Sequence, residues 1–311
     1  MVKTLDSIAS VDIAELTPNI FIEKYQKTGT PVVITGLLAA IDWNLDYLCE
    51  KLGAQTFLFR NYGSSRYKQD KRNWRNIGSG VALQSMPFTE YAKLLRDRTA
   101  HAQDIYLGKC SLKDTTLTQT PALQTIGDRL GLTKPATDFN LYMGPGGHAS
   151  GLHYDSVDGT LMQMYGEKKV VLFPPSQTYN LYPFPVYRHL RHGLKLRSWF
   201  SRVSLTQPDL ASFPRFNVAL EHQYEVILKQ GETLYIPMCW WHEVTALGDD
   251  MVCSVNRFWR VYPRSRVILS WNRWRAVSGH VCALPHMIAS FAIALLGSDR
   301  KQKLSKILHR L

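Results

Sequence analysis

The chain has 311 residues, of which 45% are hydrophobic and 20% charged, a balance that allows a substantial core and excludes an intrinsically disordered protein. The first 19 residues contain three acidic side chains and no apolar run, so we expect no secretory signal. The five cysteines show no CxxC spacing, which predicts buried thiols and a cytoplasmic location.

The formal net charge of +12 indicates an acidic partner or a polyanion such as RNA, or else a solvated surface without a partner. The basic side chains concentrate in two blocks. The first block comprises Arg188, Arg191, Lys195, Arg197 and Arg202, with His189 and His192 among them. The second comprises Arg257, Arg260, Arg264, Arg266, Arg273 and Arg275. A binding patch and a solvated face both remain open for each block.

The first hundred residues mix helix and strand. Apolar spacing and capping residues predict helices at 19–26, 43–52 and 86–98, and a β-branched run predicts a strand at 30–34. The polar, basic segment 61–76 is predicted to be a loop. These elements are expected to flank a larger sheet.

From about residue 104 the pattern changes to short β-rich runs separated by turn residues. The predicted strands are 105–107, 139–143, 160–165, 168–173, 224–228, 232–236 and 251–258. The turns at 165–167 and 229–231 are each predicted to close a tight hairpin. Several short antiparallel strands favour a sandwich or a jelly-roll barrel with its core at about 104–259.

After Trp259 the pattern becomes helical again. Helices are predicted at 264–277 and at 281–296, the second broken by Pro285, followed by a basic segment at 299–311. The apolar run 287–296 is shorter than the roughly 20 residues that cross a bilayer, so we expect no transmembrane segment. Residues 260–311 are therefore predicted to be a helical extension, buried or forming a homodimer, rather than a membrane-surface helix.

Two short motifs carry side chains that bind metals. His153 and Asp155 are separated by one residue, and alternate residues of an extended strand point to the same face. His242, about ninety residues later, would add a third ligand. Two imidazoles and a carboxylate leave coordination positions open, which is the arrangement of non-haem Fe(II) oxygenases. Alone the pattern is weak, because a lone histidine is more often a core or surface residue.

Five motifs in a fixed order strengthen this interpretation. They are HYD at 153–155, KKVVLFPP at 168–175, NLYPFP at 180–185, GETLYIPM at 231–238 and WWH at 240–242. Together they resemble the JmjC, cupin-like family of 2-oxoglutarate oxygenases, and within it the asparaginyl hydroxylases. The resemblance runs from about residue 31 to 259 and implies an oxygenase domain over 1–259. The implied fold is mainly β, a double-stranded β-helix (jelly-roll) barrel with an α/β N-terminal part and C-terminal helices.

The resemblance implies that His153, Asp155 and His242 are the Fe(II) ligands. A structural zinc site would instead be closed by four protein ligands. Three ligands on one face leave room for a bidentate co-substrate and O₂.

The resemblance also implies a set of contacts with 2-oxoglutarate. Lys168 matches the lysine that pairs with the distal carboxylate, and Tyr106 and Ser150 match hydroxyl donors to the same group. Asn256 matches an amide near the iron-bound end. From the residues alone, Lys168 could instead be a solvated residue after a turn, and Asn256 an amide that bonds to the backbone.

Two positions depart from the asparaginyl hydroxylase pattern. Gly159 stands where those enzymes have an amide side chain near the metal, and His192-Gly193 falls near the Arg-Gln pair that holds their target asparagine. These departures put recognition of asparagine in doubt.

The resemblance implies a dioxygenase that uses Fe(II), 2-oxoglutarate and O₂, with ascorbate as supporting reductant, to hydroxylate an unactivated C–H. The co-products would be succinate and CO₂. A peptide or protein side chain is the expected substrate; an RNA base or a small natural product is the alternative, and lysine demethylation is less expected. A non-catalytic cupin-like binding protein is the alternative from another class, although it would not need Lys168 inside the barrel.

Overall fold

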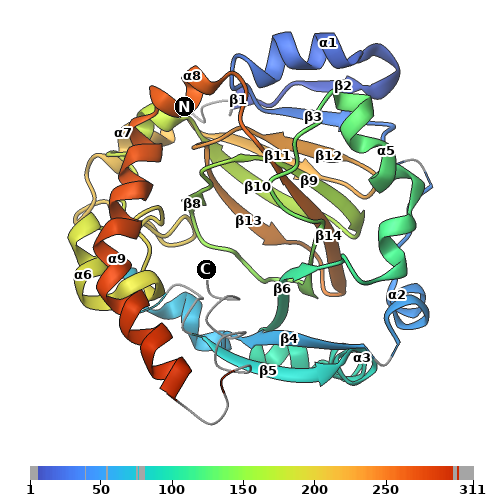
Figure 1. Ribbon diagram of the computed structural model, residues 1–311, viewed down its shortest axis with the longest axis horizontal. Coiled ribbons are helices and arrows are strands. Elements are labelled where there is room, and N and C mark those ends of the chain that lie inside the picture. Colours follow the sequence, from blue (N-terminus) through green and yellow to red (C-terminus); the bar gives the residue numbers. More distant parts are fainter. Residues whose placement is uncertain are drawn as a thin grey trace.

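The computed structural model describes residues 6–38, 40–53, 55–74, 76, 81–296 and 300. Two β-sheets face each other at the centre, and helices surround them (Figure 1). The five-stranded sheet has the order β1 (Asp6–Ser7), β11 (Tyr224–Leu228), β10 (Lys168–Phe173), β13 (Trp241–Ala246) and β8 (His153–Tyr154). The nine-stranded sheet has the order β2 (Ser10–Asp12), β3 (Val32–Thr35), β12 (Thr233–Ile236), β9 (Asp158–Tyr165), β14 (Met251–Trp259), β7 (Asn140–Pro145), β6 (Ile105–Ser111), β4 (Thr56–Asn61) and β5 (Ala82–Pro87).

The two faces of β10 show how alternation along a strand sets the barrel interior. Val170 and Leu172 pack between the sheets against β9, β11 and β12, whereas Val171 and Phe173 pack on the outer side of the five-stranded sheet. Lys168 is two residues before Val170 and therefore shares the inward face. This places a lysine on the strand face that carries Val170 and Leu172 between the two sheets.

The predicted strands are confirmed, but the two predicted hairpins are wrong. The turn at 165–167 joins β9 of the nine-stranded sheet to β10 of the five-stranded sheet, and the turn at 229–231 joins β11 to β12 in the same way. Gly166 and Gly231 have positive φ, so both turns are as tight as expected. Turn residues indicate that the chain reverses its direction, but they do not indicate which strand the next strand pairs with. Here each reversal leads from a strand of one sheet to a strand of the other. The result is the jelly-roll topology that the strand spacing indicated.

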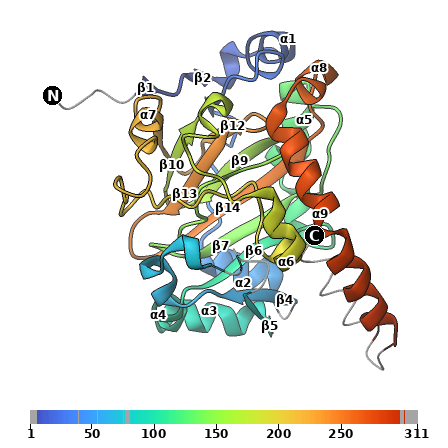
Figure 2. The same ribbon diagram turned by 90° about the vertical axis from the view of Figure 1, so that its left-hand side faces the viewer.

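The N-terminal helices cover the outer side of the nine-stranded sheet (Figures 1 and 2). Their bounds are α1 Pro18–Phe21, α2 Leu45–Leu52, α3 Phe88–Arg96, α4 Thr99–Gln103 and α5 Pro121–Leu130. Thr17 and Asn44 cap α1 and α2 by accepting backbone N–H groups, and Gly131 ends α5 in the left-handed conformation.

Some N-terminal predictions needed correction. The helix predicted at 86–98 begins at Phe88, because residues 82–87 pair with β4 as strand β5. The predicted loop at 61–76 contains two short 3-10 turns, at Ser64–Lys68 and Lys71–Asn73, although residue 75 is outside the described residues. Three strands of the five-stranded sheet, β1, β8 and β13, were not among the predicted strands.

The C-terminal region forms α8 (Arg264–Ile268) and α9 (Trp271–Leu296). The break predicted at Pro285 is wrong, since α9 is continuous there. The missing N–H of Pro285 leaves the carbonyl of Val281 without its helical partner, and water can bond to it because Val281 is exposed. By length and composition, residues 271–295 could cross a bilayer. The prediction of no transmembrane segment had considered only the shorter apolar run 287–296. The segment 299–311 lies outside the described residues except for residue 300.

The first half of α9 packs on the segment that contains α6 (His189–His192), while its C-terminal half extends from the body of the molecule (Figure 2). The ring of His280 stacks on Trp199 at 4.8 Å, and His189 stacks on the same indole. A Cβ at Gly279 would come within 2.7 Å of His189 Nε2 and Ser198 Oγ, so only glycine permits this approach. A short helix, α7 (Phe216–Leu220), completes this side.

Candidate active site

Strand pairing brings the three predicted metal ligands together. β8 and β13 are antiparallel neighbours, and their register places His153 opposite His242. Asp155 follows β8 directly, with Oδ2 3.6 Å from His242 Nε2. One ligand atom from each of the three residues lies within 4.8 Å of the others. Among the described residues no fourth His, Cys, Asp or Glu joins this group, so one face of it is open to a cavity.

Both histidines are held in the tautomer that binds a metal. His153 Nδ1 donates to the carbonyl of Gly151 at 2.8 Å, and His242 Nδ1 donates to the carbonyl of Trp240 at 3.0 Å. A carbonyl only accepts, so each Nδ1 carries the proton and each Nε2 keeps its lone pair. Burial, together with the neighbouring His242, lowers the pKa of His153 to about 4. The neutral imidazole is therefore favoured.

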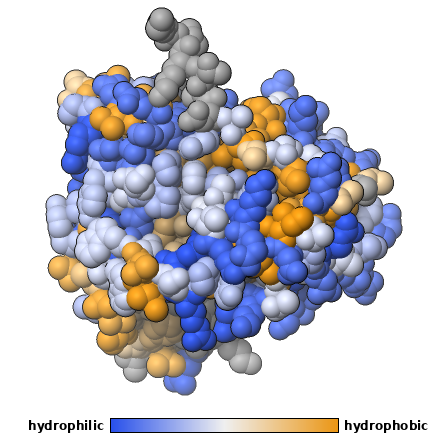
Figure 3. Space-filling model, turned by 90° about the horizontal axis from the view of Figure 1, so that it is seen from above, coloured by the Kyte–Doolittle hydropathy of each residue, from blue (hydrophilic) through white to orange (hydrophobic). Residues whose placement is uncertain are grey.

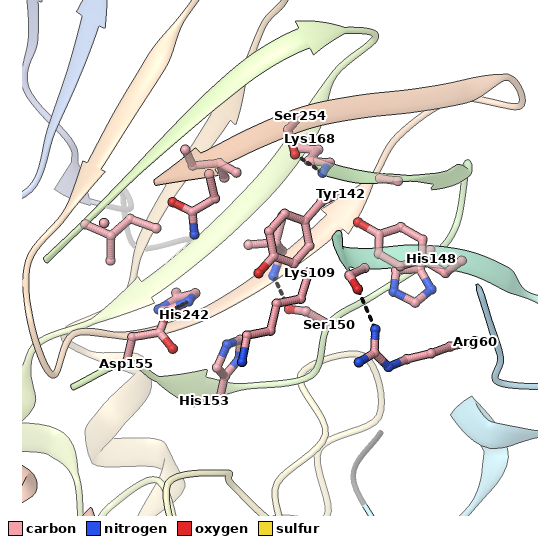
Figure 4. A pocket seen from close by; sticks show the side chains of 18 of the residues that line it. Arg60, Lys109, Tyr142, His148, Ser150, His153, Asp155, Lys168, His242 and Ser254 are labelled. Carbon is pink, nitrogen blue, oxygen red and sulfur yellow. Dashed lines mark hydrogen bonds and ion pairs between the residues drawn. The ribbon is translucent and has the colours of Figure 1, made fainter. Parts of the chain in front are cut away.

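The cavity beside the triad has a volume of about 230 Å³ and lies between the two sheets (Figure 4). Its lining combines apolar residues with a small set of polar ones, as in most small-molecule sites. The ring of Phe200 stacks on His153 at 4.7 Å and forms one wall. Leu161, Ile236 and Val244 add apolar surface that excludes water.

Lys168 lies at the far end of this cavity from the triad, as Figure 4 shows. Its ammonium donates to Ser254 Oγ at 2.5 Å, across the space between the sheets. The side chain is buried, and no carboxylate in the described part of the chain forms an ion pair with it. Burial lowers the pKa of Lys168 to about 8. A buried ammonium without an acidic partner is the feature expected where an anion binds.

The two hydroxyls predicted beside Lys168 also line the cavity. Tyr106, on β6, stacks on the ring of His148 at 3.7 Å, and His148 Nδ1 bonds to Asp104 at 2.7 Å. This stack fixes the direction of the phenol. Ser150 Oγ accepts the backbone N–H of Val244 at 3.0 Å, which leaves its own hydrogen for a weak bond to Gly151 or for a ligand.

Asn256, on β14, faces the same cavity, and its side-chain oxygen is buried without a hydrogen-bond partner among the described residues. Such an orphaned acceptor is costly unless a ligand or water donates to it. Gly159 lies opposite, and a side chain there would first meet Phe258 and Asn256 at 3.5–3.6 Å. The absent amide at Gly159 therefore leaves open space beside Asn256.

Sequence reasoning missed three cations that line the cavity, Arg60, Lys109 and Arg197. A β-bulge between Leu107 and Cys110 contains Lys109, which has a φ of 56°. Gly108, directly after the predicted strand 105–107, was the one sequence signal of that bulge. Arg197 belongs to the first basic block, which the sequence could assign only to a patch or a solvated face.

Much of the second basic block is structural. Arg266 forms an ion pair with Asp158 at 3.1 Å and donates to the carbonyl of Gln26. The buried Arg275 donates to the carbonyl of Phe184. Arg257 stacks over Phe139. Arg266 and Arg275 thus hold α8 and α9 against the rest of the molecule, and Arg257 packs beside the sheet, so the block is not one solvated face.

Comparison with known proteins agrees with this geometry. The model of the "Cupin-like domain" family matches residues 18–265, about four fifths of the chain. A "Lysine-specific demethylase JMJ31" of Arabidopsis thaliana is 33% identical over 41% of this chain and 22% of its own length. A "Lysine-specific demethylase JMJ30" of the same plant is 29% identical over 77% of this chain and 52% of its own length. The human "tRNA wybutosine-synthesizing protein 5" is 36% identical over 36% of this chain and 30% of its own length.

These curated relatives are longer proteins, and the chain spans between about a fifth and a half of each. The family match is nevertheless broad, and it contains all three residues of the triad as well as Lys168. The chain is thus a member of the JmjC, cupin-like family of oxygenases, a family that implies Fe(II) and 2-oxoglutarate.

Proposed function

We propose that this protein is an Fe(II)- and 2-oxoglutarate-dependent dioxygenase that hydroxylates an unactivated C–H of a peptide or protein side chain. The observation that carries the proposal is the joint position of two groups in one cavity. His153, Asp155 and His242 form an open three-ligand face at one end, and at the other end Lys168 is a buried cation with no acidic partner among the residues that the structure describes. A cupin-like barrel that only binds a ligand would not need both an open metal-binding face and a buried lysine in the same cavity.

The donor set fits the metal and the co-substrate. His153 and His242 would supply neutral Nε2 lone pairs and Asp155 a carboxylate oxygen, leaving open positions toward the cavity. Lys168, with the hydroxyls of Tyr106 and Ser150, would hold the distal carboxylate of 2-oxoglutarate.

When bound, Fe(II) and 2-oxoglutarate supply the oxidative chemistry: O₂ is consumed, one oxygen atom enters the C–H bond, and the other leaves in succinate as CO₂ is released. The protein orients these groups and excludes water. Phe200 limits movement of the His153 ring, the aliphatic wall keeps the cavity dry, and Asn256 offers an acceptor near the metal.

Two relatives are named lysine-specific demethylases, which supports oxidation of a protein side chain. An RNA base is a second candidate, since another relative is named a tRNA wybutosine-synthesizing protein and the net charge is +12. Binding of RNA that falls steeply between about 50 and 200 mM salt would favour that candidate.

The first test is succinate release from 2-oxoglutarate by the purified protein with Fe(II), ascorbate and air, beside the Asp155→Ala variant. Turnover that is lost in the variant supports the oxygenase. Where no turnover occurs without substrate, calorimetry with Mn(II) and 2-oxoglutarate separates the alternatives. Failure of 2-oxoglutarate to bind in the presence of Mn(II) would leave a non-catalytic cupin-like binding protein as the better description.

We propose further that the protein is cytoplasmic and that α9 belongs to a C-terminal extension, residues 260–311, through which two copies associate. Apolar side chains are exposed along α8 and α9, namely Ile268, Leu269, Trp271, Trp274, Val281, Leu284, Ile288, Ile293 and Leu295. Figure 3 shows apolar side chains gathered at the edge of the molecule where these helices run. Uncovered apolar surface of this extent is typical of an interface.

A further inference from the structure

Four arginines gather on one side of the molecule, near α6 and α7 (Figure 1). Arg188 Nη1 donates to the carbonyl of Arg72 at 3.3 Å. The guanidinium groups of Arg72 and Arg202 lie 5.5 and 5.9 Å from the ring centre of Phe213. Arg215 lies 5.0 Å from the ring centre of Tyr182, and that ring packs edge-on against Phe213. We call Arg72, Arg188, Arg202 and Arg215 the arginine cluster.

The backbone holds parts of this cluster in place. The carbonyl of Tyr182 accepts both the backbone N–H and Nε of Arg202, at 3.1 and 3.3 Å. Tyr182 has a φ of 46°, which is uncommon for a bulky residue and directs this carbonyl. Its hydroxyl accepts the backbone N–H of Arg215 at 3.0 Å. Strained backbone is thus kept at the residue that positions two of the four arginines.

Most of the cluster has no acidic partner of its own. Arg72 pairs with Asp70 at 2.6 Å and with Asp209 at 3.4 Å. No carboxylate in the described part of the chain pairs with the other three arginines of the cluster. Burial lowers the pKa of Arg202, and the neighbouring charge of Arg188 lowers it as well. Like charges that are fixed side by side repel one another, and a bound anion relieves that repulsion.

The arginine cluster borders the candidate active site. Phe200 forms an isolated bridge with His153, and Ser201 forms another with Pro183. Residues 199–202 therefore run between β8 and the segment that contains Tyr182. Arg202 comes two residues after Phe200, which is about 7 Å along an extended chain. The cluster thus begins close to the cavity wall that covers a metal ligand.

A buried lysine joins the cluster to the strand of the second histidine. Lys71 Nζ donates to the carbonyl of Val203 at 2.8 Å and lies 3.9 Å from a carboxylate oxygen of Glu243. Glu243 directly follows His242 on β13. The turn that carries Arg72 is therefore attached both to the segment of Arg202 and to the sheet of the triad.

We infer that the arginine cluster is a docking surface for an acidic segment of a protein substrate. Carboxylates of Asp or Glu in that segment pair with Arg188, Arg202 and Arg215, while a residue a few positions away enters the cavity. This inference rests on the proposed function and specifies its substrate. A guanidinium presents the paired donors that a carboxylate accepts, and the short path from Phe200 to Arg202 sets the sequence spacing.

The geometry of the cluster favours a peptide over single-stranded RNA. Proteins bind single-stranded RNA by stacking bases on open aromatic faces. Phe213 is only 6% exposed and lies under two guanidinium groups, and Tyr182 lies under that of Arg215. Tyr187, beside Arg202, is a single open ring, with 67% of its surface exposed. Three guanidinium groups without a carboxylate partner therefore offer more to acidic side chains than to a run of bases.

The first test measures binding to the full chain by fluorescence anisotropy at about 50 mM salt. The probe is a labelled twelve-residue peptide of Glu, Ser and Gly, and a peptide with Gln in place of Glu shows the effect of the charge. The double variant Arg188→Gln, Arg202→Gln should weaken binding of the acidic peptide by about tenfold or more. The matched control is Arg129→Gln, Lys134→Gln, which removes the same charge from exposed positions at the end of α5 and should change binding less than about twofold.

Three outcomes would overturn the inference. Equal losses in the two double variants would mean that net charge alone attracts the peptide. A dissociation constant above about 1 mM for the unaltered protein would show that the cluster does not bind acidic peptides. Tighter binding of a twelve-nucleotide oligouridine, lost in the cluster variant, would assign the surface to RNA.

The second test links docking to oxidation. A random ten-residue peptide library without Met, Cys and Trp is incubated with the protein, Fe(II) and 2-oxoglutarate, and peptides that gain 16 Da are sequenced by mass spectrometry. Asp and Glu should be enriched about twofold or more within about three positions of the oxidised residue, and the cluster variant should lose this enrichment. Oxidised peptides without acidic enrichment, or no oxidised peptide despite 2-oxoglutarate turnover, would refute the inference. Absence of Mn(II)-dependent 2-oxoglutarate binding by the unaltered protein would instead refute the proposed function.

Discussion

His153 and His242 lie opposite each other across the β8–β13 pair, and each donates its Nδ1 proton to the backbone carbonyl two residues before it. The backbone of each strand therefore fixes the orientation of its imidazole ring through the same kind of hydrogen bond. A metal would find both Nε2 lone pairs already directed to one point, with Asp155 as the third ligand.

We predict that His153→Ala and Asp155→Ala each reduce succinate release more than about 100-fold, since losing a ligand costs more than losing a residue that only orients one. Metal content by mass spectrometry should fall in parallel, while the circular dichroism spectrum stays unchanged. His222→Ala, at an exposed histidine, is the control. Normal metal content in both ligand variants would place the site elsewhere.

Lys168→Ala should weaken 2-oxoglutarate binding by about 100-fold, because the distal carboxylate would then be buried without its cation. Mn(II) affinity in the absence of 2-oxoglutarate should change little, and calorimetry measures both. Lys169→Ala tests the next residue of the same strand, which points to the other face. Equal affinity for 2-oxoglutarate in both variants would mean that another residue anchors it.

The affinity for 2-oxoglutarate should fall as pH rises through about 8. Burial lowers the pKa of Lys168 to about 8, so the ammonium that attracts the dianion is lost above that pH. Calorimetric titrations with Mn(II) at pH 7 and pH 9 measure the change. In Lys168→Ala the remaining affinity should not show this decline, and a decline of the same size there would assign the titration to another group.

Asp158→Ala should lower the free energy of unfolding by about 3–5 kcal/mol, because it leaves the partly buried Arg266 without its counter-ion. The same carboxylate accepts the backbone N–H of Met238 at 2.8 Å, so a second bond is lost with it. Urea unfolding measures the difference. Asp46→Ala removes an exposed ion pair with Arg96 and should have little effect; an equally small effect at Asp158 would show that α8 contributes little to stability.

The double variant Ile288→Glu, Ile293→Glu should be monomeric if two copies meet through α9. Both side chains are about two thirds exposed, so the substitutions do not disturb the barrel. Size-exclusion chromatography with light scattering should give a dimer for the unaltered protein and a monomer for the variant. A monomer in both cases would remove the dimer proposal, and binding of the unaltered chain to lipid vesicles would then assign α9 to a membrane surface.

The metal and co-substrate residues were predictable because five ordered motifs resemble one family. The two-residue period of a strand places His153 and Asp155 on one face, whereas the resemblance, and not the local pattern alone, assigned Lys168. The structure places all of them, with His242, Tyr106, Ser150 and Asn256, around one cavity. Their roles toward iron and 2-oxoglutarate remain predictions.

The positions of Arg60, Lys109 and Arg197 in the cavity wall were not predictable in this way. Lys109 faces inward because a bulge shifts the register, and Arg60 supports that bulge from another strand. Arg197 is directed by a segment whose position depends on α9. The direction of each of these side chains depends on packing between residues that are distant in the sequence. A basic run or a single glycine does not predict such packing. The wrong hairpins have the same cause, since a turn does not reveal which sheet receives the next strand.

The contact between α9 and the segment around Trp199 makes the C-terminal helix a support of the cavity wall. Gly279 and His280 fix the backbone that carries Arg197 and Phe200, yet both lie beyond residue 265, where the family match ends. The cavity wall beside the metal ligands thus depends on a helix outside the region that the family model matches. Changes in α9 would shift Phe200 and Arg197 relative to the triad, while β8 and β13, which carry the histidines, would stay in place.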